Sequence, residues 1–131
     1  MIVYLDASAL VKLVRPEPES AALGDFLAGR PRRASSKIAA AEVPLAVRRR
    51  TSDPSAFERA RSVLSDVGLL DLTDARVRLA AETDPPLKAL DAIHLATALS
   101  LIELEAFVVY DRRLIAAAEA AGLPVASPGT S

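Results

Sequence analysis

The chain contains no cysteine, and aromatic residues make up only 4% of its 131 residues. The lack of cysteine excludes disulfide bonds and thiolate metal sites, and it is typical of a protein of the reducing cytoplasm. The scarcity of aromatic rings means that base stacking cannot dominate a contact with single-stranded nucleic acid. The hydrophobic core must therefore be built mainly from Leu, Val, Ile and Ala.

No stretch reaches the roughly 20 apolar residues that a membrane-spanning helix needs, and the N-terminal MIVYLD lacks the basic segment of a signal peptide. The formal net charge is −1, so overall charge favours neither an anionic nor a cationic partner. We therefore expect a cytoplasmic protein with no membrane partner. Its length and its 51% hydrophobic content predict a single domain over residues 1–131, with a tail that frays from about Ser127.

Short apolar runs alternate with longer segments of helical character along the whole chain. Buried strands that alternate with helices predict a parallel sheet covered on both faces. The sequence therefore predicts the α/β class, with three layers and a sheet of about five strands. The predicted strands are Ile2–Leu5, Arg33–Ser36, Leu69–Leu72, Ala106–Val109 and Pro124–Ala126.

Two aspartates follow predicted strands. Asp6 comes directly after the first strand, and Asp111 follows the fourth with one residue between. Both should lie at the carboxyl edge of the sheet, where parallel α/β folds bind their ligands. Each also precedes a predicted helix, and Asp is a favoured N-cap, so helix capping is the alternative role. Capping and metal binding are compatible.

Two further acids lie in apolar helical segments. Glu42, in AAAEVPLAVRRR, has no cation three or four residues away, so its alternative to a functional role is a partner from elsewhere in the fold. Asp91, in LKALDAIHLATALS, has two structural alternatives, which are a pair with Lys88 or a cap for a helix that starts at Ala92. His94 is the only histidine, and we interpret it as a packing residue.

Carboxylates brought together repel one another and raise each other's pKa. A hard divalent cation such as Mg²⁺ or Mn²⁺ removes this conflict, because it prefers oxygen ligands. An all-carboxylate site with one or two such ions suits displacement at a phosphorus centre. The sequence contains no Walker-type phosphate loop and no G-x-S-x-G motif, and a single histidine disfavours a nucleophilic triad.

Four segments resemble, in their order, the PIN-domain ribonucleases, and specifically the VapC toxins of VapBC toxin–antitoxin pairs. These segments are YLDASALVKLVRPEPES, AAAEVPLAVRRR, LDAIHLATAL and VVYDRRLIAAAEAAGLPV, and the resemblance covers essentially the whole chain. It implies an α/β/α sandwich whose acidic cluster binds Mg²⁺ or Mn²⁺ and hydrolyses RNA phosphodiester bonds. By motif, the acids are Asp6, Glu42, Asp91 and Asp111, and Ser8 matches a hydroxyl position beside the first of them.

The resemblance also implies partners. Toxins of this type are neutralised by a cognate VapB-like antitoxin whose C-terminal segment enters the active-site groove. They commonly form homodimers and cleave structured RNA such as tRNA or rRNA. Arg112 and Arg113, next to Asp111, are expected to contact RNA phosphate or an acidic antitoxin residue. The sequence departs from the family at Val109, where many members have Thr or Ser, and residues 114–118 contain no further acid. Both departures reduce the expected support for a second metal ion.

Two alternatives belong to other functional classes. One is a catalytically silent PIN-like module that only binds RNA or its antitoxin. The other is a receiver-type phosphoacceptor domain, in which Asp71 of LLDLTD would be the acceptor. A receiver domain requires a lysine after its last strand, whereas the final lysine of this chain, Lys88, lies well before it.

Overall fold

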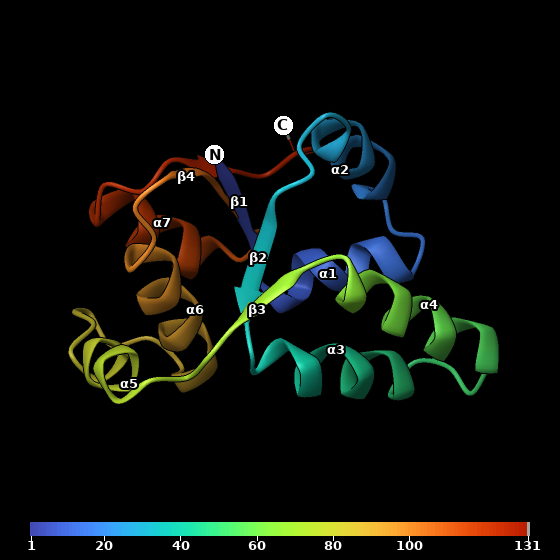
Figure 1. The fold of residues 1–131 in the computed structure, drawn as a ribbon, viewed down its shortest axis with the longest axis horizontal. Coiled ribbons are helices and arrows are strands. Elements are labelled where there is room, and N and C mark those ends of the chain that lie inside the picture. Colours follow the sequence, from blue (N-terminus) through green and yellow to red (C-terminus); the bar gives the residue numbers. More distant parts are fainter. Residues whose placement is uncertain (131) are drawn as a thin grey trace.

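The computed structural model describes residues 1–130, which form a five-stranded sheet and helices on both of its faces (Figure 1). The predicted α/β fold with a five-stranded parallel sheet is confirmed. No helix in this part of the chain has the length and apolar character needed to cross a membrane. The elements are β1 (Ile2–Leu5), α1 (Ala7–Val14), α2 (Ser20–Leu27), β2 (Arg33–Ser36), α3 (Ala39–Arg48), α4 (Pro54–Ser65), β3 (Gly68–Leu70), α5 (Asp74–Ala81), α6 (Ala89–Leu99), β4 (Leu104–Val108), α7 (Arg112–Ala120) and β5 (Val125–Ala126).

The strand order is β3-β2-β1-β4-β5, and every neighbouring pair is parallel. After β1, the chain continues to β2 on one side of β1. After β4, which lies on the other side of β1, the chain continues outward to β5. The junction of β1 and β4 is therefore the point at which the strand order reverses. In open α/β sheets, the crevice outside the carboxyl ends of the strands at such a point is where ligands bind.

Side chains alternate between the two faces along the central strands, which divides the core in two. Val3, Leu5 and Val108 pack with α1 to α4 on one face, whereas Tyr4 and Phe107 pack with α6 and α7 on the other. Figure 1 shows this division, with α1 to α4 on one side of the sheet and α5 to α7 on the opposite side. Because both faces are covered, the central strands are mainly apolar, and the exception is Glu105 near the start of β4.

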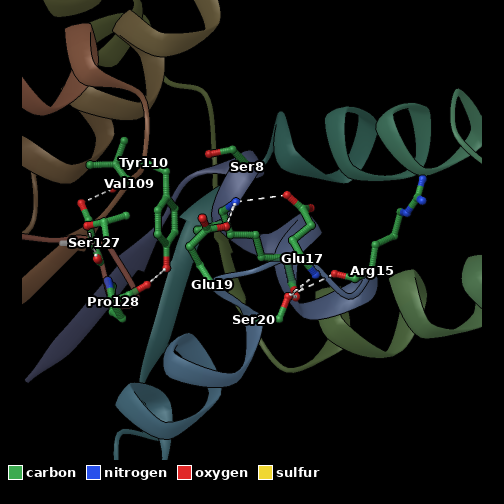
Figure 2. Close-up of polar contacts among 12 residues, drawn as sticks. Ser8, Arg15, Glu17, Glu19, Ser20, Val109, Tyr110, Ser127 and Pro128 are labelled. Atoms are coloured by element: carbon green, nitrogen blue, oxygen red, sulfur yellow. Dashed lines mark hydrogen bonds and ion pairs between the residues drawn. The ribbon is translucent and has the colours of Figure 1, made fainter.

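The C-terminal tail up to Thr130 makes hydrogen bonds to the body of the protein, and the expectation that it frays from about Ser127 stays a prediction. The Ser127 hydroxyl donates to the Val109 carbonyl at 2.6 Å, and the Tyr110 hydroxyl donates to the Pro128 carbonyl at 2.8 Å (Figure 2). These partners are 18 residues away in sequence, so local composition does not reveal them. Ser131 lies outside the described residues.

Truncation after Ala126 is expected to lower the free energy of unfolding by about 1–3 kcal/mol, because it removes two hydrogen bonds worth roughly 0.5–1.5 kcal/mol each. Urea denaturation of the full chain and the truncated chain measures this difference. Thr130→Ala is the matched control, because the Thr130 hydroxyl bonds only to Ser127 within the tail itself. Equal stability of the truncated and full chains would show that the tail contacts contribute nothing.

Candidate active site

The ends of the two central strands each present an aspartate that caps the following helix. Asp6 Oδ1 accepts hydrogen bonds from the Ala9 backbone N–H at 3.0 Å and from the Ser8 hydroxyl at 2.8 Å. Asp111 Oδ2 accepts from the Leu114 backbone N–H at 2.9 Å. The capping role considered for both residues is therefore real, but it uses one oxygen of each carboxylate. Within residues 1–130 the second oxygen makes no hydrogen bond, so capping leaves room for another ligand.

Asp91 lies in the first turn of α6, which begins at Ala89. It is therefore inside the helix, and the alternative of an N-cap for a helix starting at Ala92 is wrong. Among residues 1–130, the side-chain carboxylate of Asp91 forms neither a salt bridge with Lys88 nor a hydrogen bond. Because α6 leads back to the start of β4, its first turn lies at the same carboxyl edge as Asp6 and Asp111.

Glu42 lies in the first turn of α3, which follows β2 at this edge. Its Oε1 is 2.7 Å from Nε2 of His94, so the expected alternative of a partner from elsewhere in the fold is realised. His94 is 1% exposed, as expected for a packing residue, but the sequence argument missed its contact with Glu42. The available signal was the three-residue spacing of Asp91 and His94, which places both on one face of α6.

The electrostatics show that these acids influence one another. Burial is the main cause that raises the pKa of Asp6, and the negative charge of Asp91 adds to it against the opposing hydrogen bonds from Ala9 and Ser8. Burial also raises the pKa of Asp91, followed by repulsion from Asp111 and Glu42, and His94 and Lys88 act in the opposite direction. The net shift remains upward, so His94 and Lys88 offset the mutual repulsion of these carboxylates only in part.

The chemistry of this donor set fits a hard divalent cation, because all four side chains offer carboxylate oxygens. Asp91 and the second oxygens of Asp6 and Asp111 have no competing hydrogen bond within residues 1–130. The described residues contain no group of three or more His, Asp or Glu side chains already spaced to hold an ion. The fit therefore rests on the donor chemistry and the free oxygens of these side chains rather than on a closed cage.

A cavity of about 490 Å³ opens between α1 and α3 and reaches the acidic cluster at Ser8 and Glu42. Its walls are mainly apolar, and Arg49 and Arg50 lie among its lining residues. Lys12 also lines it, but its ammonium is hydrogen-bonded to Glu17 at 3.1 Å and to Glu19 at 2.8 Å, which joins α1 to the segment before α2 (Figure 2). The apolar lining residues are Ala7, Val11, Ile38, Ala41, Leu45, Ala46 and Leu90.

Two exposed arginines occupy the first turn of α7, directly after Asp111. Arg112 and Arg113 therefore follow the acidic cluster's Asp111 directly in sequence, and they have no ion-pair partner within residues 1–130. Arginines at the opposite edge of the sheet are different, because Arg30 pairs with Glu105 at 2.6 Å and Arg32 pairs with Glu103 at 3.6 Å. These paired residues lie at the end of the sheet opposite the acids.

Comparison with known proteins identifies the family. The model of the PIN domain matches residues 3–120. The chain belongs to the PIN-domain family. Within it, this PIN domain is 44% identical over 133 residues to ribonuclease VapC35 of Mycobacterium tuberculosis, with 98% of both chains covered.

Solved structures agree with this assignment. This PIN domain aligns with VapC20 of Mycobacterium tuberculosis, a sarcin–ricin loop cleaving toxin, with a TM-score of 0.72 at 18% identity, covering 92% of this chain and 95% of the other. It also aligns with a chain of a toxin–antitoxin complex from Klebsiella pneumoniae, with a TM-score of 0.68 at 25% identity and coverage of 96% and 97%. The similarity to VapC20 concerns the fold alone.

The family assignment overturns the receiver-type alternative based on Asp71. It also places the departure at Val109 in context. The Val109 side chain is fully buried in the core cluster that contains Tyr4, Phe107 and Leu114. The residue therefore packs the β4 end of the core, while Asp111, two residues later, presents its carboxylate at the site.

Proposed function

We propose that this PIN domain is the metal-dependent endoribonuclease toxin of a toxin–antitoxin pair. The observation that supports this most directly is the gathering of Asp6, Glu42, Asp91 and Asp111 from four helical first turns or caps at the β1/β4 switch point. The site lies beside an open cavity, as an enzyme that acts on a polymer requires. The 44% identity to a ribonuclease of the VapC family supports RNA as the substrate.

Each acid has a proposed role. Asp6, Asp91 and Asp111 hold Mg²⁺ or Mn²⁺ through oxygens that are free of other bonds, and Glu42 either completes this set or orients the attacking water. When bound, the ion neutralises charge on the phosphate oxygens and promotes ionisation of water. Ser8 donates to Asp6 and so fixes the orientation of that carboxylate. Hydrolysis leaves a 5′-phosphate and a 3′-hydroxyl.

The partners follow from the surroundings of the site. Arg112 and Arg113 bind RNA phosphate, or an acidic residue of a cognate VapB-like antitoxin that occupies the cavity in the inhibited state. The likeness to a chain of a toxin–antitoxin complex supports an antitoxin partner. We further propose that the protein forms a homodimer and acts in the cytoplasm on structured RNA of the tRNA or rRNA class.

The test is incubation of total cellular RNA with the purified protein in Mg²⁺, in Mn²⁺ and in EDTA. We expect a few discrete fragments in either metal and none in EDTA, with 5′-phosphate ends that sequencing can map. Absence of cleavage in both metals, together with tight binding of the antitoxin, would instead support the catalytically silent binding module.

A further inference from the structure

The only histidine of the chain connects the interior of the sheet to the acidic cluster. His94 on α6 is 1% exposed, and both of its ring nitrogens have partners. The Tyr4 hydroxyl on β1 lies 2.7 Å from Nδ1, and Glu42 Oε1 on α3 lies 2.7 Å from Nε2. Three separate elements thus supply a continuous polar line that ends at a carboxylate of the proposed site.

The direction of both hydrogen bonds depends on which ring nitrogen of His94 carries the proton, and we consider the arrangement with a neutral imidazole beside an ionised Glu42. An ionised carboxylate only accepts, so His94 Nε2 must carry the proton and donate to Glu42. A neutral imidazole protonated at Nε2 can only accept at Nδ1, so the Tyr4 hydroxyl must donate to it. Tyr4 is fully buried, and this burial raises the pKa of its hydroxyl, which keeps its proton available. The chain of donation therefore runs from Tyr4 through His94 to Glu42.

We propose that His94 and Tyr4 are positioning residues that hold Glu42 in its working orientation. This rests on the proposed function of the acidic cluster. Glu42 has a flexible side chain, and the negative charges of Asp91 and its neighbours repel it. A fixed N–H donor at Oε1 restrains that side chain and leaves Oε2 available for a cation or a water. Tyr4 in turn fixes the tautomer and the ring orientation of His94, as outer partners do at metal sites.

A purely structural role makes a different prediction. If His94 only fills the core, its effect on activity is independent of Glu42, and a loss of kcat would follow loss of folded protein. If His94 acts through Glu42, the effect disappears once Glu42 can no longer act. A double-mutant cycle separates these cases, because it isolates the interaction between two positions.

The experiment compares the wild type, Tyr4→Phe, Glu42→Gln and the double variant. Each protein is assayed with RNA and Mg²⁺ at a temperature well below the melting temperature of that protein. We expect Tyr4→Phe to lower kcat by about 10- to 100-fold, the usual effect of losing an outer partner, with the KM for RNA unchanged. In the Glu42→Gln background, Tyr4→Phe should lower kcat no further. An equal loss in both backgrounds would overturn the proposal.

Variants of His94 give a second arm. His94→Gln keeps an N–H donor of similar reach, whereas His94→Leu removes the donor, so we expect His94→Gln to retain more activity than His94→Leu. Phe107→Leu is the control for lost packing, because Phe107 touches Tyr4 in the same core but makes no polar contact with the site. A wild-type kcat in His94→Leu would overturn the proposal, whatever its stability.

A spectroscopic readout does not depend on cleavage. Because the chain has one histidine, its ring nitrogens give a single set of long-range ¹H–¹⁵N correlations. We expect the metal-free protein to carry the proton on Nε2, and Tyr4→Phe to alter the Nδ1 signal; a proton on Nδ1 alone would refute the assignment.

If the wild type does not cleave RNA, the proposed function fails, and the positioning role is then decided by Mg²⁺ binding. A weaker affinity in Tyr4→Phe supports it, and an unchanged affinity overturns it.

Discussion

Replacement of Asp91 by Asn is expected to abolish RNA cleavage while the protein stays as stable as the wild type or becomes more stable. The activity is lost because the variant removes a charged oxygen ligand from the proposed cation site. A metal contributes several kcal/mol to stabilising the transition state at phosphorus, so losing it lowers kcat by at least ~100-fold. Stability is retained because burial and Asp111 already raise the pKa of Asp91, so that its charge opposes folding.

The measurement pairs fragment analysis of cleaved RNA with thermal melting in EDTA, for the wild type and Asp91→Asn. Asp25→Asn is the matched control, because Asp25 is an exposed aspartate on α2, a helix that contributes no acid to the site. It should leave both cleavage and melting unchanged. An Asp91→Asn protein that is strongly destabilised yet still cleaves RNA would assign Asp91 a structural role and remove it from the proposed site.

The sheet was predictable because its information is local. Runs such as Ile2–Leu5 are apolar and of strand length, and the structure has a strand there with the same bounds. The placement of Asp6 and Asp111 at one edge followed from the same reasoning, since the carboxyl ends of parallel strands share an edge. The predicted bounds of some other strands were less accurate. β4 runs from Leu104 to Val108 rather than from Ala106 to Val109, because its pairing with β1 extends it at its start.

What the sequence did not reveal depends on contacts between distant residues. His94 meets Glu42 across 52 positions. The spacing of Asp91 and His94 places both on one face of α6, but it does not identify Glu42 as the partner. Arg30 meets Glu105 across 75 positions, and this surface ion pair likewise has no signal in the local sequence. The tail is a similar case, since its Ser and Pro residues suggest disorder until Tyr110 is placed beside them.

Replacement of Asp6 by Asn is expected to raise the melting temperature in EDTA at pH 7. With Mg²⁺ the difference should change sign, so that the variant melts at a lower temperature than the wild type. Asn is also a good N-cap, so its side-chain oxygen can still accept from Ala9 and Ser8 while the charge is lost. Burial raises the pKa of Asp6 in the folded protein, so the folded state binds more protons than the unfolded state between the two pKa values. The contribution of this bound proton to the stability of the folded state is fully present below pH 3.8, the ordinary pKa of Asp. It is lost as the pH rises through the raised pKa of Asp6 in the folded protein.

The advantage of Asp6→Asn should therefore disappear as pH falls toward 3.8, where the wild type is itself protonated. A bound ion acts in the opposite direction. At a concentration about 100 times its Kd, Mg²⁺ stabilises the folded wild type by about 2.7 kcal/mol, or about 8–13 °C for a domain of this size. The Asn variant should gain far less, because it lacks one charged ligand. Differential scanning calorimetry across pH, with EDTA and with Mg²⁺, measures both effects. A wild type that melts at the same temperature in EDTA and in Mg²⁺ would mean that these acids do not share a cation. Carboxylates that repel one another at one edge of the sheet are stabilised by a cation that binds between them, so a bound ion must raise the melting temperature.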